Sequence, residues 1–558
     1  MKRWPVIIFI GLLASVFVIY LNHRTEHFQE CDSNGIYEQL KNFPASSISF
    51  SASLGQGSFI SEIKAKEILS WSPSQKLIDF YKERYKVQNE EEFNRRVMRA
   101  LTRLNPITAF RLAYIAVLSQ IPLPYSIQSF FALPTASTYS PGAGLLFGLI
   151  NSSETSYESF MSRGTFLTLF LFILSVLLVF LTSKKMGVST LISALVATLM
   201  LFSISLYSYG YHLGSTTFNV VSVAIWLFFL VKYKDDDKLL KKMSWVTAIL
   251  LFFNYLIGVF WLSLFATLNL QKFRGFKKNL LDIYPLILII IFIFIFFYPP
   301  GQSYRGVFDI SLIPSHIYNI ILNFFGFYNH GQILNAIQFS LAAILIFIAC
   351  LGQKSFLKKF AATILVIYLL FVAAYILAFY PSRHLLIFAP LVFVFVAVGL
   401  EDFISRFNLP RGAFLFLWFT IIIFGFTSLF VRINDTKDRI TSLEQIDSDI
   451  EKVFIFDCSS SLRYKDWQSP VSIEIMKSVS FLPKVGKVYM YISQGQSLNH
   501  TLDSFKKEQT TASYQNLQIE VLSDLEERSD VCFIGYHRNK DCGFGASNSR
   551  YQTKFRIK

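Results

Sequence analysis

Charged residues are scarce in this chain. They make up 16% of its 558 residues, against 53% hydrophobic residues, and the mean hydropathy is +0.44. Because soluble globular domains carry about 25% charged residues, this composition argues against an ordinary soluble protein. Apolar runs of about 20 residues, the length that crosses a bilayer as a helix, recur from the N-terminus to about residue 431. We therefore expect an integral membrane protein.

Several common sequence motifs are also missing. The chain has no P-loop, no glycine-rich dinucleotide fingerprint and no Gly-x-Ser-x-Gly nucleophile elbow. These absences argue against an ATP-driven protein and against a soluble hydrolase. The five cysteines show no zinc-site spacing. On the topology described below, four of the cysteines lie on the outer side of the membrane. They can form disulfides or remain free thiols, and the sequence is consistent with both.

The positive charge is concentrated in short connectors between apolar runs. The net charge is +15 and the sequence pI is about 9.3, values that in a soluble protein would suggest nucleic acid. Here the lysines and arginines follow the positive-inside pattern of membrane proteins instead, so we expect membrane lipids and no nucleic acid as partners. The predicted inside connectors are 2–3, 184–185, 232–242, 272–278, 354–359 and 406–411.

These connectors define a predicted topology of about eleven transmembrane helices. It requires residues 244–270 to form two short helices hinged near Asn254 to Gly258, because one long helix would place the next basic connector outside. The N-terminus is then cytoplasmic and the C-terminus extracytoplasmic. No small-residue cleavage site follows the first apolar run, so we expect a retained anchor rather than a cleaved signal peptide. We expect the membrane to be a bacterial inner (plasma) membrane, or another membrane with an equivalent luminal face.

Two domains are expected. Residues 1–432 form a multi-spanning membrane domain that includes a large outer loop, 22–162, with a surface helix at Ala109–Gln120. A second outer loop, between Pro299 and Gly331, holds another candidate interfacial helix, Ile317–Phe327.

Residues 433–558 have a soluble composition and predict a small extracytoplasmic α/β domain. Its expected strands begin at Val453, Val488 and Val531. Its expected helices lie near Ser472 to Val479 and Leu498 to Lys507.

Three polar stretches lie between the apolar runs of the sequence. The first is Glu30-Cys31-Asp32, with Tyr37 following, directly after the first span. The second is Tyr139-Ser-Pro-Gly-Ala-Gly, followed by an arginine at the mouth of the next span, Arg163. The third is Tyr380-Pro-Ser-Arg383-His384, which opens a late span.

In this order the three stretches resemble the motifs of GT-C fold membrane glycosyltransferases, the class that includes protein mannosyltransferases and aminoarabinose transferases. Those enzymes carry an acidic residue after the first span, a Tyr-Pro-Pro pattern before an apolar stretch, and an Arg-Tyr or Arg-His segment at a late span. Ser140 stands at one proline position of the second pattern. The resemblance implies a GT-C-like membrane domain over residues 1–430. It also implies transfer of a sugar from a polyprenyl-phosphate donor to a lipid, glycan or protein acceptor on the extracytoplasmic face.

The resemblance assigns the catalytic role to the acidic pair. Asp32 is the candidate base for the acceptor proton, and Glu30 either assists it or joins it in holding a divalent cation. From the residues alone, two acids in a wet loop indicate simple solvation, or a balance of charge with His23, Arg24 and His27, rather than catalysis.

The resemblance also implies a substrate-binding set. Arg383 and His384 would bind the donor phosphate, since a guanidinium grips phosphate oxygens in a fork. Arginine at a helix boundary also snorkels to lipid headgroups, so that alternative stays open. The remaining members of the set are Tyr139, Arg163 and Tyr37.

Two other functions remain possible on the same scaffold. One is a non-enzymatic envelope-biogenesis protein or a lipid or glycan transporter. However, transporters place ionisable residues near the middle of their spans, and these predicted spans are nearly free of charge. The other is a polymerase or ligase of surface polysaccharide, which would use arginines in a large outer loop.

Overall fold

The computed structural model describes residues 4–22, 121–132, 140–203, 215–269, 283–297, 332–351, 355–373 and 386–444, five short strands after residue 450, and single positions at 118, 206 and within 321–327. The chain divides into two compact units, with the later boundary between Ser428 and Leu429. The first unit is helical, and the second contains a β-sheet.

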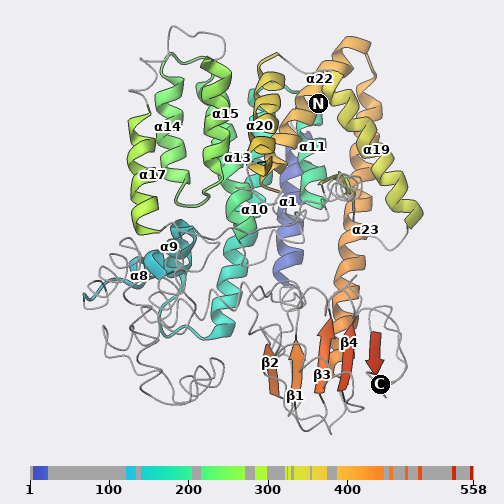
Figure 1. Ribbon diagram of the computed structural model, residues 1–558. Helices are drawn as coiled ribbons and strands as arrows, with labels where there is room; N and C mark the ends of the chain where they lie inside the picture. Colours follow the sequence, from blue (N-terminus) through green and yellow to red (C-terminus); the bar gives the residue numbers. More distant parts are fainter. Residues whose placement is uncertain are drawn as a thin grey trace. The chain divides into compact units, whose positions relative to one another are not determined.

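The first unit is a bundle of helices (Figure 1). Its described helices are α1 (Trp4–Asn22), α8 (Tyr125–Ala132), α9 (Pro141–Ile150), α10 (Tyr157–Lys185), α11 (Thr190–Phe202), α13 (Ser215–Tyr233), α14 (Leu239–Leu250), α15 (Ile257–Asn269), α17 (Tyr284–Phe296), α19 (Gln332–Leu351), α20 (Ser355–Ala373), a short 3-10 helix (Leu386–Phe388) and α22 (Ala389–Phe407). The last helix, α23 (Arg411–Glu444), begins in the first unit and continues past its boundary at Ser428.

Six of the described helices are long and apolar enough to cross a membrane: α1, α10, α13, α19, α22 and α23. Shorter apolar helices of 10–17 residues include α9, α11, α15 and α17. These helices confirm the expected α-helical membrane protein. The total of about eleven spans stays a prediction.

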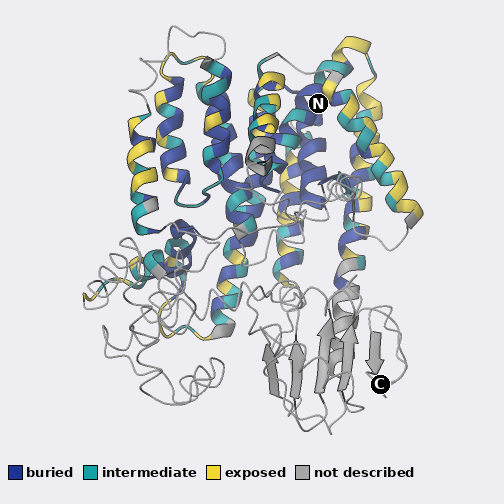
Figure 2. Cartoon of the chain, viewed as in Figure 1, coloured by how far each residue is buried: buried dark blue, intermediate teal, exposed yellow. Residues whose placement is uncertain are grey.

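The outer faces of several helices are apolar and exposed (Figure 2). Ile333 and Leu341 of α19 are 79% and 62% exposed, and Phe416 of α23 is 76% exposed. In water such faces would favour aggregation, whereas lipid acyl chains solvate them at no cost. The exposed faces therefore belong in the hydrocarbon region.

Buried tryptophans join helices in the interior of the bundle. Trp226 of α13 donates its indole N–H to Thr247 Oγ1 of α14 at 2.9 Å, and Trp418 of α23 donates to Thr198 Oγ1 of α11 at 2.8 Å. Both tryptophans are fully buried. A buried indole N–H needs such an acceptor, so each pair fixes one helix against another.

The predicted break within residues 244–270 is confirmed: α14 ends at Leu250 and α15 begins at Ile257. Asn254, which is 2% exposed, stabilises the turn between them. Its Oδ1 accepts the N–H of Leu256 at 2.9 Å, and its Nδ2 donates to the carbonyl of Asn219 at 3.4 Å. Asparagine favours this position because its side chain bonds to nearby backbone in a turn.

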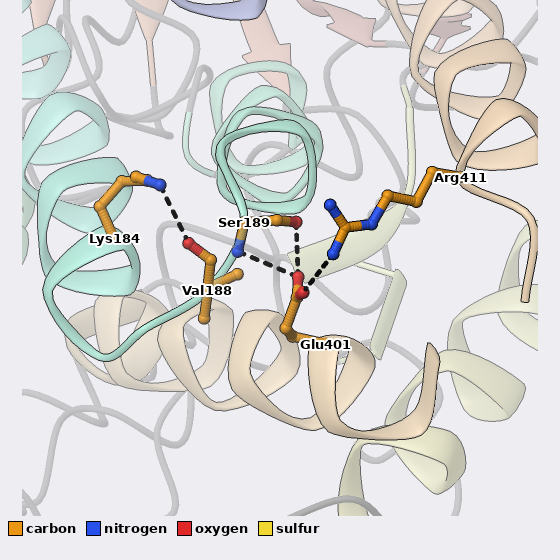
Figure 3. A network of polar contacts seen from close by, with 5 residues as sticks. All are labelled: Lys184, Val188, Ser189, Glu401 and Arg411. Carbon is orange, nitrogen blue, oxygen red and sulfur yellow. Dashed lines mark hydrogen bonds and ion pairs between the residues drawn. The ribbon is translucent and has the colours of Figure 1, made fainter. Parts of the chain in front are cut away.

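Three basic connectors lie at one end of the bundle, and Figure 3 shows the carboxylate that joins two of them. Glu401 Oε2 accepts the backbone N–H and the hydroxyl of Ser189 at 3.0 and 2.5 Å, and Glu401 Oε1 lies 3.5 Å from the guanidinium of Arg411. The third connector, which follows α13, lies beside the first one: Lys185 Nζ of the first connector is 5.9 Å from the ring centroid of Phe228 in α13. We call this part of the unit, formed by residues 184–189, 228–242 and 401–411, the basic end.

The second unit contains a five-stranded sheet in the order β2-β1-β3-β4-β5. The strands are β1 (Lys452–Ile455), β2 (Ser472–Ile475), β3 (Val488–Ile492), β4 (Val531–Gly535) and β5 (Thr553–Arg556). β1, β2, β3 and β4 pair in parallel, and β5 pairs antiparallel to β4.

One prediction in this unit is wrong. Residues 472–475, expected to be helical, form β2 instead. The alternation Ser-Ile-Glu-Ile has the two-residue period of a strand, and isoleucine favours the extended backbone. The expected helix at Leu498–Lys507 lies outside the described residues, so the α/β assignment of this domain stays a prediction.

Candidate functional site

Most of the predicted site lies outside the described residues. These positions are Glu30, Asp32, Tyr37, Tyr139, Arg383 and His384, so whether the acidic pair and the Arg-His pair meet stays a prediction. The predicted surface helix at 109–120 lies largely outside them, and the one at 317–327 lies partly outside them. The structure does describe the segment that follows Tyr139 and ends with Arg163.

That segment begins with α9, a short helix held tightly at its N-terminus. Pro141 occupies the first turn, where its fixed φ and missing N–H are tolerated. The N–H of Gly142 donates to the carbonyl of Phe252 at 2.6 Å, in the turn between α14 and α15. A residue of the second motif is thereby attached to the hinge that the charge pattern predicts.

Two glycines of α9 allow this close approach. A Cβ at Gly142 would lie 2.5 Å from Phe253 Cδ1 and 2.7 Å from the carbonyl oxygen of Phe252. A Cβ at Gly148 would lie 2.6 Å from both the Cα of Ser126 and the hydroxyl of Ser129 in α8. Both contacts are shorter than any side chain tolerates, so α9 packs backbone to backbone on two sides.

Aromatic rings complete the packing. Phe147 of α9 is fully buried, with ring centroids 5.8 Å from Phe160 of α10 and 5.5 Å from Phe218 of α13. Phe130 of α8 packs against Phe252 and Phe297 at 5.8 and 5.3 Å. We call the assembly of α8, α9 and the turn at residues 251–256 the α8–α9 platform.

The platform and the basic end lie at opposite ends of the same helices. Phe160, near the start of α10, contacts the platform, whereas Lys185 is its last residue. The 25 residues between them correspond to about 37 Å of helix, more than the roughly 30 Å hydrocarbon core of a bilayer. α13 likewise runs from Phe218 at the platform to Lys232 at the basic end.

Arg163 binds the far end of α9. Its guanidinium donates from Nη1 to the carbonyl of Ile150, the last residue of the helix, at 3.0 Å. A cation is favourable there because the C-terminal carbonyls carry the negative end of the helix dipole. The side chain is exposed, and its other N–H groups have no partner among the described residues. Arg163 can therefore cap α9 and still offer donors to a ligand.

Replacing Arg163 with glutamine should lower the stability of the protein modestly, by about 1 kcal/mol, because one exposed charge-assisted hydrogen bond is lost. Arg163→Lys should lower the stability only about half as much as Arg163→Gln does, since an ammonium can still approach the Ile150 carbonyl. Thermal unfolding of the two variants in detergent tests this. Equal midpoints for the wild-type protein and Arg163→Gln would contradict the capping role.

The platform also holds polar groups that the sequence analysis did not single out. The hydroxyl of Ser129 and the Oδ1 of Asn151 are buried and have no hydrogen-bond partner among the described residues. Asn151 is the C-cap residue that follows α9, and its Nδ2 donates to the carbonyl of Phe147 at 3.0 Å. Buried polar groups without partners are costly, so each is expected to meet a partner that the described residues do not supply.

The Asp235–Asp237 run lies at the basic end and serves the connector itself. Asp236 accepts the N–H of Lys238 at 2.8 Å and pairs with the ammonium of Lys242. The hydrogen bond from Lys242, followed by that from Lys238, lowers the pKa of the Asp236 carboxyl below its ordinary value. The pair's contribution to stability is therefore present above the ordinary pKa of aspartate and lost as pH falls through the lowered one.

A metal site is not apparent in the part of the chain that the structure describes, where no three His, Cys, Asp or Glu side chains cluster. The proposed ligands Glu30 and Asp32 lie outside that part.

No protein family matches the chain, and no curated protein is significantly similar to it.

Proposed function

We propose that the protein is a membrane glycosyltransferase that moves a sugar from a polyprenyl-phosphate donor to a lipid, glycan or protein acceptor. One observation carries this proposal: α9, which begins the second motif, is packed into the α8–α9 platform and capped by Arg163, at the end of the helices opposite the basic connectors. A transferase that uses a lipid-linked donor needs such a fixed element at the membrane surface, because both substrates must be held in register.

The charge distribution gives the proposed orientation. The basic end faces the cytoplasm under the positive-inside rule, so the platform faces the extracytoplasmic side. The predicted acidic stretch with Glu30 and Asp32 follows the platform end of α1 in the same topology. The reaction is then extracytoplasmic, at a bacterial inner membrane or an equivalent luminal face, and the C-terminal domain is expected to be extracytoplasmic as well.

The chemistry is divided between two groups of residues. Asp32 removes the proton of the acceptor hydroxyl or amine, and Glu30 supports it, directly or by sharing a divalent cation. Arg383 and His384 stabilise the charge that develops on the departing phosphate. Tyr37, Tyr139 and the free N–H groups of Arg163 contact the substrates.

The described helices argue against the transporter alternative. Within the six candidate membrane spans, the lysine, arginine, aspartate and glutamate side chains lie toward the span ends, as at Arg163, Lys185 and Glu401. A transport pathway requires ionisable groups near the middle of the membrane.

The proposed function is tested with purified full-length protein in lipid nanodiscs. The protein should release polyprenyl phosphate from a set of polyprenyl-phosphate sugars in the presence of membrane extract as acceptor, and the sugar should appear in a product of matching mass. If none of the donors is consumed, and loss of the gene leaves the masses of envelope lipids, glycans and proteins unchanged, the transferase assignment is wrong.

A further inference from the structure

A basic and aromatic strip lies at the basic end. The rings of Phe228, Phe229 and Tyr233, in the last two turns of α13, contact one another in sequence, with centroid separations of 5.9 and 5.8 Å. All three rings are partly exposed. Together they form a continuous aromatic surface at the point where α13 leaves the membrane.

Three helices place ammonium groups over these rings. Lys185 of α10 lies 5.9 Å from the centroid of Phe228, and Lys232 of α13 lies 5.6 and 5.5 Å from those of Phe229 and Tyr233. Lys242 of α14 lies 4.7 Å from the centroid of Tyr233. Cation–π contacts hold the three charges along one strip.

Two of the three charges are not neutralised. Asp236 pairs with Lys242, whereas Lys185 and Lys232 are exposed and form no ion pair within the described residues. The local excess is positive, because residues 232–242 contain five lysines and three aspartates, and Lys184 and Lys185 add to it.

The position of the strip at the membrane boundary indicates a lipid as its partner. Lys184 and Lys185 lie in the last turn of α10, and Lys232 in that of α13. These are membrane boundaries, where lipid phosphates lie. Lysines provide the charge for an anionic headgroup, and the rings lie beside the glycerol and upper acyl region, as aromatic residues do at membrane interfaces. A soluble anion would use the lysines but not the aromatic surface.

We propose that the strip of Phe228, Phe229 and Tyr233, with Lys185, Lys232 and Lys242, binds the headgroup of an anionic glycerophospholipid in the leaflet at the basic end. The bound lipid fixes the ends of α10, α13 and α14 relative to one another. This binding is independent of the proposed transferase reaction, since it requires only that the helices span a membrane.

The test compares lipid binding by full-length variants in detergent, using native mass spectrometry with phosphatidylglycerol as the probe and phosphatidylcholine as the neutral reference. The double variant Lys185→Ala/Lys232→Ala should bind phosphatidylglycerol about 25-fold more weakly, because each lysine near an anionic headgroup contributes about fivefold in affinity. Its affinity for phosphatidylcholine should not change.

The matched control removes the same amount of charge at the basic end, from positions away from the rings. In Lys234→Ala/Lys241→Ala, two exposed lysines are lost, and the affinity for phosphatidylglycerol should fall less than about threefold. Lys185→Arg/Lys232→Arg should keep most of the affinity, since arginine also stacks on rings. The proposal is overturned if the two alanine variants lose affinity equally, or if Lys185→Ala/Lys232→Ala binds as the wild-type protein does.

Discussion

Replacing Asp32 with asparagine is expected to lower the rate of sugar transfer about 10²- to 10⁴-fold, the usual contribution of a general base. The amide keeps the size of the side chain but cannot take the acceptor proton. Binding of the donor should change little, because its phosphate is assigned to Arg383 and His384. The measurement is release of polyprenyl phosphate by purified protein at saturating donor concentration.

Asp235→Asn provides the matched control. It removes one carboxylate at the basic end, where the side chain is exposed, and should leave the transfer rate unchanged. If Asp32→Asn transfers sugar at the wild-type rate while its thermal unfolding is unaltered, then Asp32 is not the base.

Gly142→Ala should destabilise the protein by about 1–3 kcal/mol, the cost of overpacking a rigid contact. The new Cβ would lie 2.7 Å from the carbonyl oxygen of Phe252, and this backbone atom cannot move without breaking the turn at residues 251–256. The hydrogen bond from the Gly142 N–H to that carbonyl would be lengthened or lost. Thermal unfolding in detergent should show a lower midpoint.

Gly258→Ala is the control for this substitution. Gly258 lies in the first turn of α15, and a Cβ there would meet no atom within 4 Å. Alanine is favoured over glycine in helices by about 1 kcal/mol, so this variant should be as stable as the wild-type protein or more so. Equal losses of stability in the two variants would contradict the packing of α9 against the turn.

The sequence predicted those features that depend on periodicity and charge. Apolar run length identified membrane helices, and the basic connectors required the break that the structure places between Leu250 and Ile257. Connectors rich in lysine and arginine stay on the cytoplasmic side of a membrane. The distribution of these residues along the chain therefore constrains the topology without any knowledge of how the helices pack.

Features that depend on contacts between distant segments could not be predicted in this way. The sequence places Gly142 in the second polar stretch, and only the fold shows that Gly142 approaches Phe252 and that Gly148 approaches Ser129. Arg163 was expected to bind substrate, whereas its observed partner is the carbonyl of Ile150. β2 was mistaken for a helix because four residues are too few to separate the two periods reliably.

The candidate site itself was predicted from residue types and from their order along the chain. These specify which groups can take a proton or bind a phosphate, but not the distance between Asp32 and Arg383, because some 350 residues separate them. The α8–α9 platform supports only the intermediate part of that site, between Tyr139 and Arg163.

The most direct test of the central claim is a cross-linking measurement in native membranes. Cys31, next to Asp32, is kept as one reactive thiol, the other four cysteines are replaced by serine, and His384→Cys supplies the second. A short, membrane-impermeant bis-maleimide added from the extracytoplasmic side should join the two positions, whereas Lys185→Cys in place of His384→Cys should give no cross-link. If Cys31 and position 384 react only from opposite sides of the membrane, or never join, the acidic pair and the Arg-His pair do not share a site and the proposed transferase mechanism is wrong.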